Sequence, residues 1–165
     1  MNIRNTILLF VFMVGLVSCN NTKKNDKTNN LSKKEVTIDL QKQIDDCENQ
    51  LKIAVPKITD LTKHPRLIDT DKKEWKQVEN HKLRWTSGFY PGVLWYAYNV
   101  TGNEKWKKEA IKRTEVFEDF KNITEHHDIG FMMFPAYGKG YEIGGKKEYK
   151  DILLTSAASL ATRFN

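Results

Sequence analysis

The stretch "GNEKWKKEA" at residues 102–110 has a counterpart 43 residues further on, "GKKEYKDIL" at residues 145–153. In both copies a glycine precedes a charged turn, and an aromatic side chain, Trp106 or Tyr149, follows four residues after that glycine. A repeat of about this length is typical of proteins that are built from two-helix hairpins. The pair of stretches therefore indicates helical hairpins in series.

A second pair of similar stretches has almost the same spacing. "SGFY" at residues 87–90 is followed 42 residues later by "IGFM" at residues 129–132. Glycine and aromatic residues are common, so either pair alone is weak evidence, but the two offsets agree. Together they predict stacked or toroidal helical hairpins, in which the turns on one rim approach each other and binding groups collect there.

Helical periodicity covers most of the chain after the first 34 residues. Apolar residues that recur in steps of three and four predict one long helix, which begins with a capping box of Ser32 and Glu35 and ends near Pro65. Further helices are expected over residues 91–99, 103–120 and 147–165. The residues expected on inward faces are Leu40, Ile44, Cys47, Leu51, Ala54, Ile58, Leu61, Trp106, Ala110, Phe117, Phe120, Tyr149, Ile152, Leu153, Leu160 and Phe164. No segment alternates like a clean strand, so the expected fold class is all-α.

The first 19 residues, "MNIRNTILLFVFMVGLVSC", have the composition of a secretory signal. Arg4 precedes an apolar run that is too short for a membrane-spanning helix. The ending "LVSC" resembles a bacterial lipobox, in which Cys19 becomes the lipidated first residue of the mature chain. The alternative is an ordinary cleaved signal with a chance cysteine. Lipidation at Cys19 predicts an exported, membrane-anchored bacterial lipoprotein on the periplasmic or cell-surface face.

Residues 20–34, "NNTKKNDKTNNLSKK", are almost free of apolar side chains and predict a flexible polar tether. Residues 1–34 hold six basic side chains and one acid, which gives +5 of the chain's net charge of +6. The high pI thus belongs to the leader and tether, and no nucleic-acid partner is expected. Cys47 is the only other cysteine, so no disulfide framework or cysteine-based zinc site is available.

The polar stretch "HHDIGFMMFPAYGKGYE" at residues 126–142 places His127 and Asp128 directly before bulky apolar residues. In the repeat, this pair occupies the rim position that follows Trp85 in the earlier copy. An indole face can stack on a sugar ring, and a carboxylate can act as an acid or base where burial shifts its pKa. The same spacing also suits Asp128 as a helix N-cap, Trp85 as a core residue and His126 as a solvated turn residue.

Three stretches resemble the unsaturated glucuronyl hydrolases, family 88 of the glycoside hydrolases: "WTSGFYPGVLWYAYNVTG", "HHDIGFMMFPAYGKGYEIGG" and "AASLATRFN". The resemblance covers roughly residues 50–165. It implies an (α/α)6 barrel and a substrate class, oligosaccharides with a 4,5-unsaturated uronic acid that polysaccharide lyases leave at the non-reducing end. By motif match it implies that Asp128 is one of two catalytic aspartates, and that His127 and Trp85 contact the unsaturated sugar.

The resemblance also implies an unusual hydrolysis. An acid protonates C4 of the enol ether, water adds at C5, and the resulting hemiketal collapses and releases the partner sugar. In that family the principal acid/base is a second aspartate, at a spacing that falls beyond Asn165. Six hairpins also need far more than 165 residues. We therefore expect residues 35–165 to be the N-terminal part of the glycosidase domain, with little activity by themselves.

Other functions fit the same features. A non-catalytic glycan-binding lipoprotein, or a helical scaffold for a partner, would use Trp85 for stacking and His127 and Asp128 for hydrogen bonds only. The unsaturated rhamnogalacturonyl hydrolases of family 105 share the barrel and the vinyl-ether chemistry. No cofactor or metal is expected, because the sequence has no phosphate-cradling glycine loop, and the adjacent His126, His127 and Asp128 lack helical ligand spacing.

Overall fold

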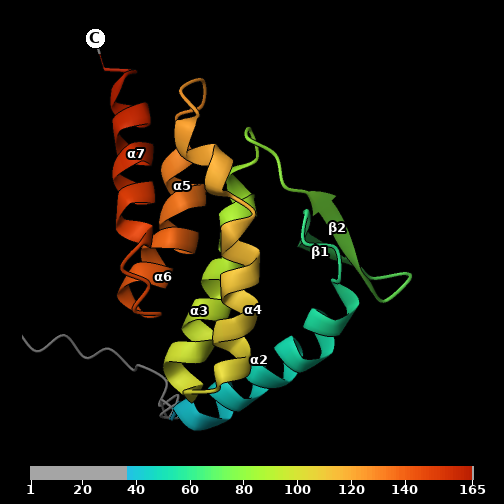
Figure 1. Ribbon diagram of the computed structural model, residues 1–165. Coiled ribbons are helices and arrows are strands. Elements are labelled where there is room, and N and C mark those ends of the chain that lie inside the picture. Colours follow the sequence, from blue (N-terminus) through green and yellow to red (C-terminus); the bar gives the residue numbers. More distant parts are fainter. Residues whose placement is uncertain (1–36, 165) are drawn as a thin grey trace, which may run out of the picture. The chain divides into compact units, whose positions relative to one another are not determined.

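The computed structural model describes residues 37–164 and is predominantly helical (Figure 1). The α-helices are α2 (Leu40–Ala54), α3 (Phe89–Thr101), α4 (Glu104–Glu115), α5 (Ile129–Met133), α6 (Lys139–Glu142) and α7 (Tyr149–Ala161). The strands are β1 (Lys63–Asp69) and β2 (Glu74–Glu79). The 3₁₀ turns are η1 (Val55–Lys57), η2 (Trp85–Gly88) and η3 (Glu118–Asn122), and a π-helical turn, η4 (Phe134–Gly138), joins α5 to α6.

Four predictions fall on residues that the structure does not describe. They are the signal at residues 1–19, lipidation at Cys19, the tether at residues 20–34, and the capping box of Ser32 and Glu35. Among the described helices, none has the length and apolar character that crossing a membrane requires.

The repeat corresponds to two helical hairpins, as predicted. α3 and α4 form the first, and α5, η4 and α6 run together against α7 in the second (Figure 1). Gly102 has a φ of 66° in the first turn and Gly145 a φ of 70° in the second. This left-handed conformation favours glycine and ends a helix cleanly. Trp106 and Tyr149, four residues after these glycines, are both buried.

The core lies between the hairpins and contains several large aromatic side chains. Trp95 of α3 is fully buried, and its indole Nε1 donates to Thr114 Oγ1 of α4 at 3.0 Å. That bond matters because an unpaired buried donor costs about 1–3 kcal/mol. In the second hairpin the rings of Tyr137 and Tyr149 meet edge to face, with centroids 4.7 Å apart.

The first helix is shorter than predicted. Its N-cap is Asp39, whose side chain accepts from the backbone N–H of Lys42 at 3.0 Å. The α-helix ends at Ala54, and a 3₁₀ turn that contains Pro56 replaces the expected continuation towards Pro65. Pro56 lacks the backbone N–H that the next α-helical hydrogen bond needs, so the α-helix ends there and a 3₁₀ turn follows.

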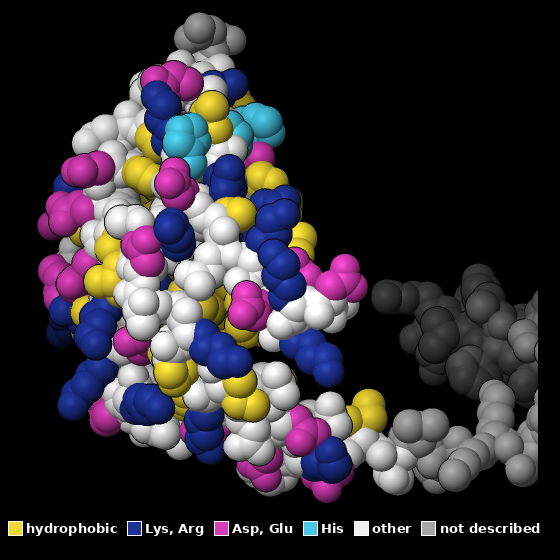
Figure 2. Space-filling view, turned by 90° about the vertical axis from the view of Figure 1, so that its right-hand side faces the viewer, with side chains coloured by type: hydrophobic (Ala, Val, Ile, Leu, Met, Phe, Trp, Pro, Cys, Tyr) yellow, Lys and Arg dark blue, Asp and Glu magenta, His cyan; other side chains and the backbone are white. Residues whose placement is uncertain are grey.

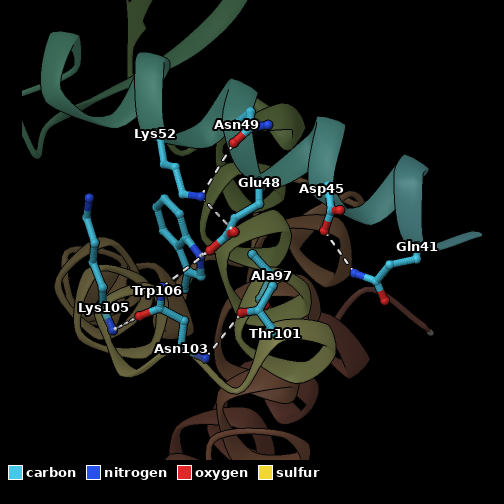
Figure 3. Close-up of polar contacts among 10 residues, drawn as sticks. All are labelled: Gln41, Asp45, Glu48, Asn49, Lys52, Ala97, Thr101, Asn103, Lys105 and Trp106. Carbon is cyan, nitrogen blue, oxygen red and sulfur yellow. Dashed lines mark hydrogen bonds and ion pairs between the residues drawn. The ribbon is translucent and has the colours of Figure 1, made fainter.

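A carboxylate attaches α2 to the first hairpin (Figure 3). Glu48 Oε1 accepts from Trp106 Nε1 at 2.9 Å and from Asn103 Nδ2 at 3.3 Å, and Glu48 Oε2 lies 2.9 Å from Lys52 Nζ. The hydrogen bonds from Lys52 and Trp106 hold the pKa of Glu48 below its usual value. Glu48 therefore gives the buried indole N–H of Trp106 its partner.

The expectation that the chain contains no strand is wrong. β1 and β2 pair antiparallel, from Lys63 opposite Glu79 to Asp69 opposite Glu74. Most residues of both strands are exposed or half-buried, so the alternation of a strand with one buried face is missing from the sequence. In the turn between the strands Lys73 adopts a φ of 54°, a conformation that its residue type does not predict.

Some residues predicted to face inward are exposed. Leu40 is 69% exposed and Phe164 84% exposed, and Leu61 and Cys47 are exposed as well. Periodicity marks one face of a helix, but it does not show how far along that face a neighbour reaches. The other predicted residues are buried or half-buried: Ile44, Leu51, Ala54, Ile58, Trp106, Ala110, Phe117, Phe120, Tyr149, Ile152, Leu153 and Leu160.

Arg113 of α4 ties the loop before the β-hairpin to the helices. Its guanidinium is buried and donates to the carbonyl oxygens of Ile58 and Asp60, while Nε donates to Glu109 Oε1 at 3.0 Å. The charged group also lies over the ring of Tyr90, 5.2 Å from its centroid. Because two of these partners are backbone carbonyls and the other two are side chains of α3 and α4, Arg113 fixes where the β-hairpin leaves the helical part.

Candidate active site

Trp85 opens the turn that leads into α3, and its side chain is partly exposed. Phe89 and Phe131, at equivalent positions of the two repeats, lie against the indole edge to face, with centroids 5.4 Å and 6.0 Å away. Both phenylalanine rings are exposed too. Trp85 is therefore a surface aromatic that two rings hold in place, and the alternative of a core residue does not apply.

Gly88 allows the rim turns of the two repeats to meet. A Cβ at this position would lie 2.2 Å from the carbonyl oxygen of Met132 in α5. No side chain fits at that distance, so the close approach of η2 to α5 requires glycine. As the repeat predicts, the two neighbouring turns place Trp85 and Asp128 at the same end of α3 and α5 (Figure 1).

Asp128 directly precedes α5, but its side chain makes no capping hydrogen bond. Its carboxylate lies between two imidazoles instead, with Oδ1 3.2 Å from His127 Nε2 and Oδ2 3.9 Å from His126 Nε2. The Asp128 side chain is 22% exposed. The carboxylate is thus partly desolvated, still accessible, and next to groups that can exchange a proton with it.

The two histidines differ in their surroundings. His127 is 74% exposed, so it can reach a bound molecule. His126 is 17% exposed, its ring stacks on that of His127, and its Nδ1 accepts from the backbone N–H of Asp128 at 3.1 Å. The prediction that His126 is a solvated turn residue is therefore wrong, because it supports the Asp128 backbone. With Nδ1 as acceptor, the proton of the neutral ring is on Nε2, which faces Asp128.

Sequence reasoning missed a buried polar group that contacts Thr86, in the turn that begins at Trp85. His64 of β1 is only 2% exposed, and its ring nitrogens lie 2.9 Å from Asn80 Oδ1 and 3.1 Å from Thr86 Oγ1. Asn80 Nδ2 donates to the carbonyl of Leu61, so Asn80 Oδ1 is the atom that faces His64 Nδ1. Nδ1 therefore carries the proton, and Nε2 accepts from the Thr86 hydroxyl.

The hydroxyl of Thr86 completes this network. While it donates to His64, it accepts from Arg66 Nη1 at 2.9 Å. Burial lowers the pKa of His64; the hydrogen bond to Asn80 opposes this shift, and the nearby Arg84 and Arg66 cations reinforce it. A neutral His64 thus holds the turn after Trp85 from the β-hairpin side. His64 is a single histidine in a segment without a clear apolar pattern, so the sequence gave no signal that could have revealed this role.

A cavity of about 550 Å³ opens beside Trp85. Its walls come from α2, the β-hairpin and the start of α3, and they include Arg66, Trp75 and Tyr90. Burial raises the pKa of Tyr90 to about 12, and its hydroxyl finds no hydrogen-bond partner among residues 37–164. Aromatic walls with a few polar groups suit the apolar faces and hydroxyls of a saccharide.

Groups for metal binding do not assemble in the described region. In residues 37–164 no three side chains of His, Cys, Asp or Glu are placed to hold an ion together. The chemistry that this rim can offer with its own side chains is stacking on Trp85, hydrogen bonding by His127 and proton exchange or electrostatic stabilisation by Asp128.

The helical hairpins match part of an (α/α)6 barrel of the kind found in glycoside hydrolases. Within that class, the chain is homologous to the unsaturated glucuronyl hydrolases of family 88 and spans about a third of their length. No family model matches the chain.

Two curated relatives illustrate the sequence similarity. An unsaturated glucuronyl hydrolase of Formosa agariphila is 29% identical over 160 residues, which are 96% of this chain and 39% of the relative. An unsaturated chondroitin disaccharide hydrolase of Streptococcus pneumoniae is 35% identical over 83 residues, 48% of this chain and 21% of the relative.

Solved structures agree with the sequence comparison. A heparin-specific unsaturated glucuronyl hydrolase superimposes with a TM-score of 0.67 at 31% identity, over 76% of this chain and 33% of its own. A mutant unsaturated glucuronyl hydrolase from Streptococcus agalactiae, in complex with dGlcA-GalNAc6S, gives a TM-score of 0.64 at 27% identity, over 75% of this chain and 32% of its own.

Proposed function

We propose that residues 35–165 form the N-terminal part of a hydrolase that acts on 4,5-unsaturated uronyl oligosaccharides released by polysaccharide lyases. The observation that carries the proposal is the carboxylate of Asp128, held between His126 and His127 on the rim that also carries the exposed Trp85. The homology to unsaturated glucuronyl and chondroitin disaccharide hydrolases supports it.

The proposed reaction consumes one water molecule. A proton adds to C4 of the C4–C5 double bond, and the water oxygen bonds to C5 while the water gives up a proton. The hemiketal at C5 then opens to a ketone, and the bond to the neighbouring sugar breaks, so that this sugar leaves with a proton on its oxygen. Acid–base groups with suitable pKa values accelerate these proton transfers.

Each rim residue has a defined part in this proposal. Asp128 hydrogen-bonds near C4 and C5 and helps to hold the attacking water, as its partly desolvated carboxylate allows. The exposed His127 donates a hydrogen bond to the unsaturated sugar, whose ring stacks on Trp85. Phe89 and Phe131 keep the indole at a fixed angle, so less side-chain freedom is lost when the sugar binds.

The reaction itself gives the test. The complete protein that contains this chain is mixed with dGlcA-GalNAc, and the ultraviolet absorbance of the C4–C5 double bond is followed together with release of free GalNAc. We expect both signals to change at the same rate. Stable absorbance with measurable disaccharide binding would contradict the proposal and favour a glycan-binding protein. Turnover of unsaturated rhamnogalacturonan disaccharides alone would favour family 105 chemistry.

We also propose that the protein is exported and anchored to a membrane through an acylated Cys19. The support is the signal-like composition of residues 1–19 and the lipobox-like ending "LVSC". Mass spectrometry of the mature N-terminus tests this, with a Cys19→Ala variant as the control. A lipidated Cys19 and membrane fractionation that the variant loses are expected. Cleavage at another residue, or an unmodified Cys19, would overturn the proposal.

A further inference from the structure

A third side chain, His126, contacts both His127 and Asp128 of the proposed site. Its Nδ1 accepts the backbone N–H of Asp128 at 3.1 Å, and its Nε2 lies 3.9 Å from Asp128 Oδ2. Its ring stacks on that of His127, with centroids 5.1 Å apart and planes inclined by 15°. One imidazole therefore contacts the backbone and carboxylate of Asp128 and the ring of His127.

The loop that carries His126 is itself anchored to distant parts of the chain. The carbonyl oxygen of Thr124 accepts from Arg163 Nη1 at 3.0 Å. Glu125 Oε1 lies 3.1 Å from Lys82 Nζ, which belongs to the loop before the other rim turn. In Figure 2 the visible histidine side chains gather near the end of the molecule at which α3 and α5 begin. His126 thus links an anchored loop to Asp128.

The bond from Asp128 to His126 has the pattern of an Asx turn. In such a turn the side-chain oxygen of asparagine or aspartate accepts the backbone N–H two residues further on. Here an imidazole nitrogen takes the place of that oxygen. Since the Asp128 side chain makes no capping hydrogen bond to α5, the contacts of its backbone decide where the carboxylate points. The bond to His126 is one of these contacts.

An equivalent histidine turn precedes the other rim turn. His81 Nδ1 accepts the backbone N–H of Leu83, two residues further on, also at 3.1 Å. Both His81 and Leu83 are exposed, whereas His126 is 17% exposed and its bond ends on an ionisable residue. The same hydrogen bond is therefore present in both repeats, and in the second it orders a group of the proposed site.

We propose that His126 is a positioning residue for the proposed hydrolysis. Through Nδ1 it fixes the backbone of Asp128, and so it holds the carboxylate where it acts near C4, C5 and the attacking water. The inference rests on the proposed function and adds a residue to its site. In this role His126 touches no reacting atom and acts through Asp128.

This role predicts an effect on kcat more than on KM. A group that is held in place does not have to reorient when the transition state forms. Displacing a reacting group by about 1 Å can slow a reaction by about 10²-fold. The turn after Trp85, in contrast, is held by the contacts of Thr86 with the β-hairpin. Stacking of the sugar on Trp85 should therefore persist when residue 126 is changed.

Three substitutions at residue 126 separate the hydrogen bond from the ring stack. His126→Asn supplies the acceptor of an Asx turn and removes the ring. His126→Phe keeps a ring against His127 and removes the acceptor, and His126→Ala removes both. The complete protein is assayed with dGlcA-GalNAc. We expect kcat within about threefold of the parent for His126→Asn, and roughly tenfold to hundredfold lower for the other two.

His81→Phe is the matched control, because it removes the same kind of hydrogen bond from the other turn. Its kcat should equal that of the parent. Chemical denaturation of all four variants shows whether stability changes with the rate. Equal losses of kcat in His81→Phe and His126→Phe, or losses that follow the loss of stability, would assign His126 a structural role and overturn the inference.

Hydrogen exchange of the Asp128 amide reports on the bond without turnover. Exchange should be faster in His126→Phe and His126→Ala than in the parent and His126→Asn, because the N–H loses its acceptor. Parental kcat in His126→Phe, or a low kcat in His126→Asn with a protected amide, would overturn the inference.

The same measurement separates this inference from the proposed function. If the parent protein binds dGlcA-GalNAc without hydrolysing it, the proposed function fails. Protection of the Asp128 amide in His126→Asn and its loss in His126→Phe would then retain His126 as the residue that positions Asp128. Equal exchange in all variants would overturn that position as well.

Discussion

The two rim turns are equivalent in the repeat, yet they are held in different ways. The turn after Trp85 is bonded to residues far away in the sequence, because Thr86 contacts both His64 and Arg66 of the β-hairpin. The polar contacts of the Asp128 side chain are with its two preceding neighbours. The stacking platform is therefore built into the tertiary structure, while the carboxylate depends on a short local sequence and on the close packing of α5.

The difference suggests a division of tasks between the two turns. A platform that must present one face of an indole gains from a rigid foundation, since a preorganised surface loses less entropy when it binds a ligand. A carboxylate that takes part in proton transfer needs neighbours that respond to its charge, and two imidazoles beside it provide this. The predictions below test how differently the two repeats respond to equivalent changes.

The largest effect on stability is expected from the glycines of "SGFY" and "IGFM". Gly88→Ala places a Cβ 2.2 Å from the Met132 carbonyl oxygen and should lower the free energy of unfolding by about 3 kcal/mol or more, as overpacking does. Gly130→Ala, at the equivalent position, meets no atom within 4 Å and should raise it by about 0.5 kcal/mol through helix propensity. Chemical denaturation of both variants measures the contrast, and equal effects would contradict it.

A smaller contrast is expected for the aromatic residues that follow Gly102 and Gly145. Each donates to a glutamate: Trp106 Nε1 to Glu48 Oε1 at 2.9 Å, and Tyr149 Oη to Glu115 Oε1 at 3.1 Å. Trp106→Phe removes this bond and also leaves a void, so we expect a loss of about 2 kcal/mol. Tyr149→Phe removes a hydroxyl only and should cost about 1 kcal/mol. Thermal unfolding compares them, and a larger loss for Tyr149→Phe would contradict the packing described here.

The contact between His64 and the turn that begins at Trp85 should be sensitive to acid. Burial lowers the pKa of His64 below its usual 6.5, so the unfolded chain takes up a proton that the folded protein resists. The contribution of His64 is then fully present above pH 6.5 and decreases as the pH falls towards its folded-state pKa. As the pH is lowered from about 7.5 to about 5, the free energy of unfolding should fall less steeply in His64→Gln than in the parent. The difference between the two slopes should correspond to about one proton. Equal slopes would show that His64 is not the group responsible.

The smallest effect is expected at the hydroxyl of Tyr90. It is buried and has no hydrogen-bond partner among residues 37–164. Replacing it by hydrogen in Tyr90→Phe removes a polar group that has lost its water, so stability should stay the same or rise, within about 0.5 kcal/mol. Ring packing against Arg113 is retained in this variant. A clear loss of stability in denaturation would indicate a partner for the hydroxyl in the complete protein.

The sequence was sufficient to predict the helical hairpins because their signals are local. Gly102 and Gly145 mark left-handed turns, and a buried aromatic follows each at the same distance. The β-hairpin could not be predicted because its strands bury too few side chains to give an alternating apolar pattern. The turn between the strands contains Lys73 at a positive φ, and lysine is not a residue type that predicts such a turn. Long-range packing decides such segments, and periodicity does not report it.

In the candidate site, too, the features with local sequence signals could be predicted and those that depend on long-range packing could not. The neighbourhood of His127 and Asp128 is contiguous in sequence, so the pair was visible directly, and the repeat placed Trp85 at the same rim. His126 was misjudged, because its exposure depends on how it stacks against His127. His64 could not be predicted, since its role arises only when the β-hairpin folds against Thr86.

The most direct test of the account is turnover by an Asp128→Asn variant of the complete protein. Asparagine keeps the shape of the side chain and removes its charge, so the variant isolates the electrostatic role of the carboxylate. We predict that loss of the double-bond absorbance of dGlcA-GalNAc slows by roughly 10²- to 10⁴-fold. Asp119→Asn, the same change at an exposed aspartate of η3, should turn over substrate at the parental rate. Parental turnover by a normally folded Asp128→Asn protein would contradict the account.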